Sequence, residues 1–175
     1  MSAARPLTLA IDTALKTCQA AVIDGDAVLG ASSAPAKGDA EAIATHVDKA
    51  LAAAGREASA LGAIAVTVGP GSFTGVRVGI AYAKGIGFAL NVPVRGAPTL
   101  EVMARAAMVG PTLAVIDARH GAVFAGLFLA PDAPAHTLAR LDVEACATLA
   151  RAHGAQVVGE ASAIAALGLG GVREH

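Results

Sequence analysis

The sequence predicts an α/β protein of two tandem domains, each opening with a β-hairpin meander, the second shorter than the first. Short apolar segments with strand patterns alternate with segments of helical periodicity along the chain. The segment Thr8–Asp12 (TLAID) is echoed by Thr112–Asp117 (TLAVID), and a short turn and a further apolar strand follow each one. This echo indicates either an internal duplication or a chance similarity between alanine-rich strands. Duplication places the two domains at residues 1–110 and 111–175.

The elements of the first domain follow from local patterns. Antiparallel strands are expected at 7–13, 17–24 and 27–33, with Gly25 and Asp26 as a turn signal. A helix is expected at 40–54, with Asp39 as its N-cap and apolar residues at helical spacing. A buried strand at 61–68, a helix from about 76 to 90, a short strand at 94–95 and a helix at 99–108 complete this domain.

The second domain repeats this order over a shorter length. Strands are expected at 112–117, 122–129 and 137–141, then a helix at 143–153, a strand at 155–158 and a helix at 162–167. The proline- and alanine-rich segment 131–134 reads as a linker between strands.

Composition excludes several classes of protein. Only 15% of the 175 residues are charged and 55% are hydrophobic, which is incompatible with a disordered chain. Charged or breaking residues interrupt every apolar run well before the roughly 20 residues that a membrane-spanning helix needs. The net charge of −1 gives no bulk electrostatic reason for direct nucleic-acid binding. Two lone cysteines, Cys18 and Cys146, and the lack of an apolar leader block predict a cytoplasmic protein.

The most distinctive motif is Gly69–Gly75 (GPGSFTG), which follows an expected strand and opens a helix. Backbone N–H groups in this context can receive an anion, and a nucleotide phosphate is one interpretation. The motif lacks the Gly-Lys-Ser/Thr of a Walker A loop. The alternative is a tight turn in which Ser72 or Thr74 caps the helix.

The helix after this loop is apolar on nearly every side, which predicts that it is buried on nearly every side. Small residues recur every four positions along one face, and bulky apolar residues form two further stripes. Interior glycines weaken a helix by about 0.8–1 kcal/mol each relative to alanine, so close backbone packing is expected to compensate. The small-residue face contacts either the chain's own core or a second helix, for which the helix 40–54 or a partner protein is the candidate. The small residues are Gly75, Gly79, Ala83 and Gly87.

The sequence contains few recognisable catalytic motifs. The five histidines are scattered without metal-ligand spacing, so neither a metal nor a cofactor is expected. No Ser elbow or Cys–His pairing stands out, and no catalytic residue is assigned. Asp12 and Asp117 end equivalent strands and are either phosphate or Mg²⁺ ligands or simple turn formers.

Three segments together resemble the TsaB (YeaZ) family: Leu9–Thr13 (LAIDT), Val68–Gly85 (VGPGSFTGVRVGIAYAKG) and Val115–Arg119 (VIDAR). The glycine block is the most specific of these, and the resemblance extends from Leu7 to about Leu129. It implies the actin/Hsp70/sugar-kinase (ASKHA, ribonuclease H-like) fold. It also implies a non-catalytic partner of TsaD, a metal- and ATP-dependent subunit. With the ATPase TsaE, these proteins transfer threonylcarbamoyl to the tRNA adenosine beside the anticodon, so contact with tRNA is expected only through the partners.

The resemblance also implies site residues. Asp12, Thr13 and Asp117 would form a vestigial phosphate-binding site. Ala14 stands where the family commonly has serine, which removes a hydroxyl from that turn. The two helices of the first domain would bind TsaD or a second copy of the chain through Phe73, Thr74, Arg77, Val78, Gly79, Tyr82, Ala83, Ile86, His46 and Ala50.

Two other functions stay open on the sequence alone. One is a glycoprotease-like hydrolase, or an ATPase or kinase of the same superfamily, that uses Asp12 and Asp117. The other is a phosphate-sensing module built on the loop Gly69–Gly75. Family members are also usually longer, and the shortened second domain weakens the case for ATP binding.

Overall fold

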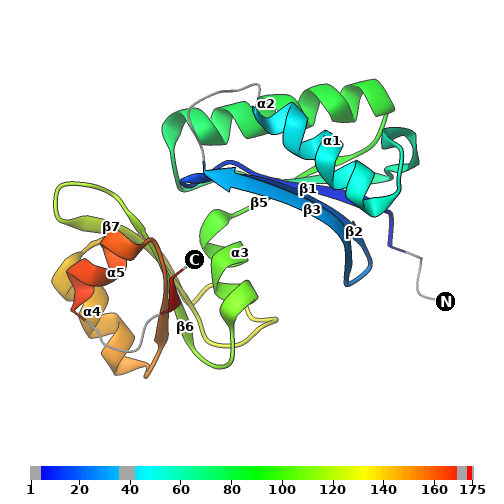
Figure 1. Cartoon of the computed structure of the whole chain (residues 1–175). Coiled ribbons are helices and arrows are strands. Elements are labelled where there is room, and N and C mark those ends of the chain that lie inside the picture. Colours follow the sequence, from blue (N-terminus) through cyan, green and yellow to red (C-terminus); the bar gives the residue numbers. More distant parts are fainter. Residues whose placement is uncertain (1–4, 36–41, 169–172, 175) are drawn as a thin grey trace. The chain divides into compact units, whose positions relative to one another are not determined.

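The computed structural model describes residues 5–35, 42–168 and 173–174, and the chain divides into two units, Met1–Ala97 and Pro98–His175 (Figure 1). The first unit contains a five-stranded sheet in the order β3-β2-β1-β4-β5. Its strands are β1 (Thr8–Asp12), β2 (Thr17–Asp24), β3 (Ala27–Pro35), β4 (Ala63–Thr67) and β5 (Val94–Ala97). The first three form the expected antiparallel meander, and β4 and β5 extend it in parallel.

Two helices cover one face of this sheet (Figure 1). Helix α1 (Ala42–Ala54) packs on β2 and β3, and helix α2 (Phe73–Leu90) packs on β4, β1 and β5. A short 3-10 turn, η1 (Ala58–Ala60), precedes β4. Alternate residues of the strands, such as Leu9 and Ile11, point into the core beneath the helices. The expected N-cap Asp39 lies outside the described residues.

The ends of α2 follow from local sequence. The Ser72 hydroxyl accepts a hydrogen bond from the Gly75 N–H, which confirms Ser72 as the N-cap. At the other end Asn91 adopts a left-handed conformation with φ of 54°, a usual way to end a helix.

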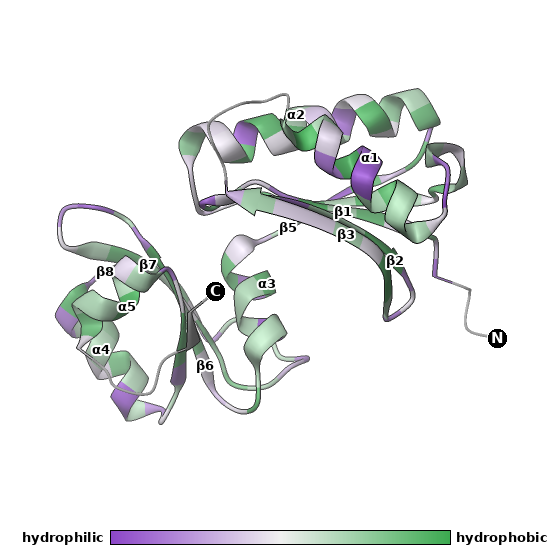
Figure 2. Ribbon diagram, viewed as in Figure 1, coloured by the Kyte–Doolittle hydropathy of each residue, from purple (hydrophilic) through white to green (hydrophobic). Residues whose placement is uncertain are grey.

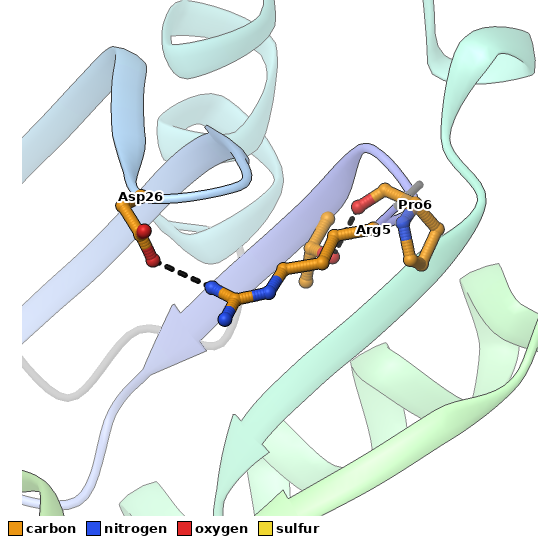
Figure 3. A network of polar contacts seen from close by, with 4 residues as sticks. Arg5, Pro6 and Asp26 are labelled. Atoms are coloured by element: carbon orange, nitrogen blue, oxygen red, sulfur yellow. Dashed lines mark hydrogen bonds and ion pairs between the residues drawn. The ribbon is translucent and has the colours of Figure 1, made fainter. Parts of the chain in front are cut away.

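The N-terminal segment of the first unit makes two exposed polar contacts (Figure 3). The Arg5 guanidinium pairs with the Asp26 carboxylate in the β2–β3 turn at 2.5 Å, and the Thr8 hydroxyl donates to the Pro6 carbonyl at 2.8 Å. Both charged side chains are mostly exposed, so this ion pair adds little to stability.

The second unit repeats the topology of the first. Its sheet has the order β10-β9-β6-β7-β8, in which β6 takes the place of β1. The strands are β6 (Thr112–Asp117), β7 (Ala122–Phe128), β8 (Thr137–Asp142), β9 (Gln156–Gly159) and β10 (Arg173–Glu174). Helices α4 (Val143–Ala152) and α5 (Ala161–Leu167) have 10 and 7 residues, against 13 and 18 in α1 and α2. The predicted fold class, with a shortened second copy, is therefore confirmed.

Helix α3 (Thr99–Ala107) belongs to the second unit. It contacts β6, β7 and β9, and the Gln156 amide donates to the Ala107 carbonyl at 2.7 Å. Other residues of the same sheet form a core with α4 and α5. Strand β6 is therefore buried on both of its faces. The boundary between units thus precedes α3, whereas the sequence pattern placed it after this helix. The local pattern of α3 does not reveal which sheet its apolar face covers.

Candidate functional site

The glycine loop packs against the turn between β1 and β2. The Ser72 N–H donates to the Ala14 carbonyl at 2.6 Å, and the Thr13 hydroxyl donates to the Gly75 carbonyl at 2.7 Å. A Cβ atom on Gly71 would overlap the Ala14 carbonyl oxygen, and one on Gly75 would overlap the Thr13 carbonyl oxygen. Both positions therefore require glycine because the two backbones touch.

This packing favours the tight-turn interpretation of the loop. The N–H groups of Ser72 and Gly75 are already engaged within the chain, by the Ala14 carbonyl and the Ser72 hydroxyl. An anion would have to compete with those bonds. Gly71 and Gly75 are explained by close approach to the β1–β2 turn without a ligand, and Gly69 by its positive φ of 98°.

The small-residue face of α2 lies on the chain's own sheet. Gly79, Ala83 and Gly87 are the buried residues of this helix. A Cβ on Gly79 would overlap the Thr13 hydroxyl oxygen, and one on Gly87 would overlap a Val94 methyl group. The assignment of Gly79 and Ala83 to a partner surface is therefore wrong, because the sheet already occupies that face.

Two residues of α1 that the sequence assigned to the partner surface are also buried. Ala50 is fully buried, and its carbonyl oxygen lies so close to Gly30 of β3 that a Cβ on this glycine would overlap it. His46 is buried as well, and its Nδ1 lies 2.8 Å from the Ser32 hydroxyl in β3. Both side chains hold α1 on the meander and are not available to a partner.

Three further candidates lie at the margin of the core. Val78, Tyr82 and Ile86 are half-buried and pack against the cluster that includes residues of α1. Burial raises the pKa of the Tyr82 hydroxyl, and the nearby Asp48 carboxylate of α1 raises it further. Tyr82 therefore lies near α1.

The outer side of α2 carries large exposed aromatic side chains. Phe73 is 74% exposed and Phe88 is 90% exposed. The Arg77 guanidinium stacks 3.4 Å above the centre of the Phe73 ring and donates to the Phe73 carbonyl at 3.1 Å. Thr74 is exposed as well. Of the sequence-predicted interface residues, Phe73, Thr74 and Arg77 are therefore the fully exposed ones.

Sequence reasoning missed Phe88, which the helical pattern placed in a bulky apolar stripe. Its spacing offered a signal, since Phe73, Arg77, Lys84 and Phe88 fall on one helical face. Figure 2 shows α2 mainly in hydrophobic and near-neutral colours with short purple stretches. Within the first unit this helix is buried on its glycine face and open on its outer face, so burial on nearly every side would require a partner.

The two strand-end carboxylates form turns. Asp12 Oδ1 accepts from the Ala14 N–H at 2.9 Å and from the Thr67 hydroxyl at 2.7 Å. Asp117 Oδ1 accepts from the Arg119 N–H at 2.7 Å in the equivalent turn between β6 and β7. The same turn in both units accounts for the aspartate that ends each echoed segment. Thr13, the third residue of the candidate phosphate site, is buried, and its hydroxyl donates to the Gly75 carbonyl.

The described parts of the chain contain few groups suited to metal binding or thiol chemistry. No three histidine, cysteine, aspartate or glutamate residues among them are grouped to hold a metal ion. Cys18 and Cys146 are free and buried, and burial raises the pKa of both thiols, to about 11 for Cys146. No helix in the described ranges has the length and apolarity to span a membrane.

Comparison with known proteins places the chain in a family. A family model described as "TsaD: tRNA N6-adenosine threonylcarbamoyltransferase" matches residues 34–167. The chain is 38% identical over 120 residues to "tRNA threonylcarbamoyladenosine biosynthesis protein TsaB" of Escherichia coli (strain K12), which covers 66% of this chain and 52% of that protein. A protein of the same name from Haemophilus influenzae is 33% identical over 120 residues. The chain thus spans about half the length of the curated relatives it matches.

Solved structures agree with this placement. "YeaZ from Pseudomonas aeruginosa" superposes with a TM-score of 0.71 at 30% identity, covering 79% of this chain and 68% of that one. A second structure from that organism, described as similar to peptidase YEAZ, gives a TM-score of 0.74 at 30% identity. The match covers 89% of this chain and 75% of that one. The ethanolamine utilization protein EutJ of Carboxydothermus hydrogenoformans, with a TM-score of 0.59 at 12% identity, shares the fold alone. Sequence, topology and these likenesses agree, and the chain belongs to the TsaB (YeaZ) family.

Proposed function

We propose that this chain is an accessory, non-catalytic subunit of the machinery that adds threonylcarbamoyl to the adenosine beside the anticodon of tRNAs. Its partners in this proposal are a TsaD-like subunit, which carries the metal- and ATP-dependent chemistry, and a TsaE-like ATPase. The chain reaches tRNA only through these partners and acts in the cytoplasm. The family membership and the names of the relatives support this pathway.

One observation carries the role of a binding subunit. Phe73 and Phe88 expose 74% and 90% of their surface on one face of the same helix. Exposing large aromatic side chains to water is unfavourable, and aromatic and arginine side chains are enriched where protein partners bind. The outer face of α2, defined here as Phe73, Thr74, Arg77, Ala81, Lys84, Gly85 and Phe88, is therefore the proposed partner-binding surface.

The half-buried residues Val78, Tyr82 and Ile86 have a supporting role in this proposal. They pack α2 against the core that includes α1 and so hold the outer face in position. A homodimer would use the same exposed face and would compete with the TsaD-like partner. The two states are therefore mutually exclusive on this surface.

The turn roles of Asp12 and Asp117 support an accessory role over a hydrolase or kinase. One oxygen of each carboxylate is committed to backbone or hydroxyl donors of its own turn. The loop that a phosphate would approach is packed against the β1–β2 turn. Any vestigial binding of phosphate by Asp12, Thr13 and Asp117 would therefore be weak.

Reconstitution tests the proposal. The chain is added to TsaD and TsaE from the same organism with a tRNA substrate, threonylcarbamoyl-adenylate and ATP, and modified adenosine is measured by mass spectrometry. We expect formation of the modified base to require the chain, while the chain alone shows negligible ATPase activity and no stoichiometric metal. Robust ATP turnover or tight metal binding by the isolated chain would favour the hydrolase or kinase alternative.

A further inference from the structure

Two histidines of the second unit lie against each other at its surface. His136 directly precedes β8 and is exposed, and His153 directly follows the last residue of α4 and is half-buried. The centroids of their imidazole rings are 5.0 Å apart, and the ring planes are inclined at 61°. Imidazole is a preferred ligand of zinc, copper and nickel ions, so two neighbouring imidazoles that solvent can reach form a candidate pair of metal ligands.

The backbone holds both histidines in place. The His136 N–H donates to the Leu127 carbonyl of β7 at 2.8 Å. His153 is the C-cap of α4, and the next residue, Gly154, has a φ of 56° and donates its N–H to the Arg151 carbonyl at 3.2 Å. Helix α4 in turn contacts β7 and β8. The two rings are therefore positioned by elements of the same unit, so a ligand that joins them has little chain to order.

The separation of the rings matches that of two imidazoles bound to one metal ion. With a Zn–N bond of about 2.1 Å, the centroid of a coordinating imidazole lies about 3.2 Å from the metal. A centroid separation of 5.0 Å then corresponds to an angle of about 100° at the metal, which is near the tetrahedral angle that zinc prefers. The χ2 torsion of histidine varies broadly, so each ring can turn one nitrogen towards a shared ion without movement of the backbone.

We propose that His136 and His153 together bind one divalent transition-metal ion of the Zn²⁺ class, with water completing its coordination. Mg²⁺ and Ca²⁺ prefer oxygen ligands, so the pair selects against them. Two protein ligands, against four in a structural zinc site, give a Kd on the order of 10 µM, which is far weaker than the metal binding of a metal-dependent hydrolase or kinase. The bound ion would join the connection before β8 to the end of α4 and stabilise the second unit by mass action. The inference is independent of the proposed function.

The experiment is a calorimetric titration of the full chain, free of any polyhistidine tag and stripped of metal with EDTA, with Zn²⁺ and separately with Mg²⁺. The test variants are His136→Asn and His153→Asn. The matched control is His120→Asn, which removes another exposed imidazole of the second unit from a position with a φ of 54° that asparagine adopts readily. Circular dichroism checks that each variant is folded. NMR of the imidazole nitrogens shows which histidines the ion contacts, and this readout needs only the wild type.

Under the proposal, each test variant raises the Kd for Zn²⁺ by about tenfold or more, and His120→Asn leaves it within about twofold. Mg²⁺ should bind the wild type at least about tenfold more weakly than Zn²⁺. Zn²⁺ should also shift the imidazole signals of His136 and His153 and raise the thermal midpoint of the wild type more than that of either test variant. A wild type that binds no Zn²⁺, or Zn²⁺ binding that leaves both imidazole signals unmoved, would overturn the inference and identify the pair as an aromatic contact only. Equal loss of binding in His120→Asn would overturn it as well.

Discussion

The Cα of Gly79 faces the Thr13 hydroxyl so closely that a Cβ at position 79 would overlap that oxygen. These residues are far apart in sequence, and their contact brings α2 onto the end of β1. The Thr13 hydroxyl in turn donates to the Gly75 carbonyl one turn earlier in the helix. The glycines on this face of α2 are therefore determined by contacts inside the first unit.

Replacement of Gly79 by alanine tests this contact. The new methyl group must displace Thr13 or push α2 from the sheet, and overpacking of this kind costs about 1–3 kcal/mol. The matched control is Gly85→Ala in the same helix, where a Cβ meets no atom within 4 Å. That substitution should stabilise the protein by up to about 1 kcal/mol through helix propensity. Urea denaturation of the two variants should therefore show shifts of opposite sign, and a shift of the same sign would contradict the packing of α2 described here.

Removal of the Thr13 hydroxyl is a second test of the same region. Thr13→Val keeps the shape of the side chain and removes the donor to the Gly75 carbonyl, so we expect a loss of about 1–2 kcal/mol in the free energy of unfolding. Thr8→Val serves as the control, because the hydrogen bond from its hydroxyl to Pro6 is exposed to solvent. Equal effects of the two substitutions would show that the Thr13 hydrogen bond adds nothing specific.

Alkaline pH should destabilise the second unit through Cys146. Burial and the nearby Asp142 raise the pKa of this thiol in the folded state from about 9 to about 11. The thiol is protonated in both states below about pH 9, so its contribution to stability is complete there and is lost as the pH rises towards about 11. Cys146→Ala should therefore reduce the fall in urea midpoint between about pH 8 and about pH 10.5. An unchanged fall in that variant would mean that other groups control the alkaline transition.

The His46–Ser32 contact fixes α1 on the meander. Ser32→Ala leaves His46 buried without this partner, and we expect a loss of about 1–2 kcal/mol in the free energy of unfolding. Binding to TsaD should be unaffected at temperatures where the variant is folded, because both side chains are directed into the first unit. Reduced affinity in a fully folded Ser32→Ala protein would restore His46 to the partner surface.

The sequence predicted the architecture well, and it predicted the functional surface only in part. Strand patterns around Thr8–Asp12 and Thr112–Asp117 indicated two repeated sheets, because the alternation of apolar residues depends on local neighbours. The orientation of α2 depends instead on the distant Thr13, so its glycine face could not be distinguished from a partner surface. The same limit applies to Phe88, whose exposure is decided by which face meets the sheet.

The position of α3 illustrates a second limit. Its helical pattern was correct, yet no local feature says that Leu100 lies near Gly126 of β7, where the two residues belong to the second unit. Assignment of a helix to a sheet is a tertiary property, set by the total apolar area that each arrangement buries.

The outer face of α2, and not its glycine face, is the surface proposed to bind the partner. The most direct test is the calorimetric affinity for TsaD of the double variant Phe73→Ser/Phe88→Ser. Val109→Ser, at an 84% exposed position of the second unit, serves as the control. Because both phenylalanines are exposed, the unfolding free energy of the double variant should change by no more than about 1 kcal/mol. We predict a Kd for TsaD at least about thirtyfold weaker, as expected for loss of an aromatic anchor. Undiminished affinity in a folded double variant would contradict this assignment of the binding surface.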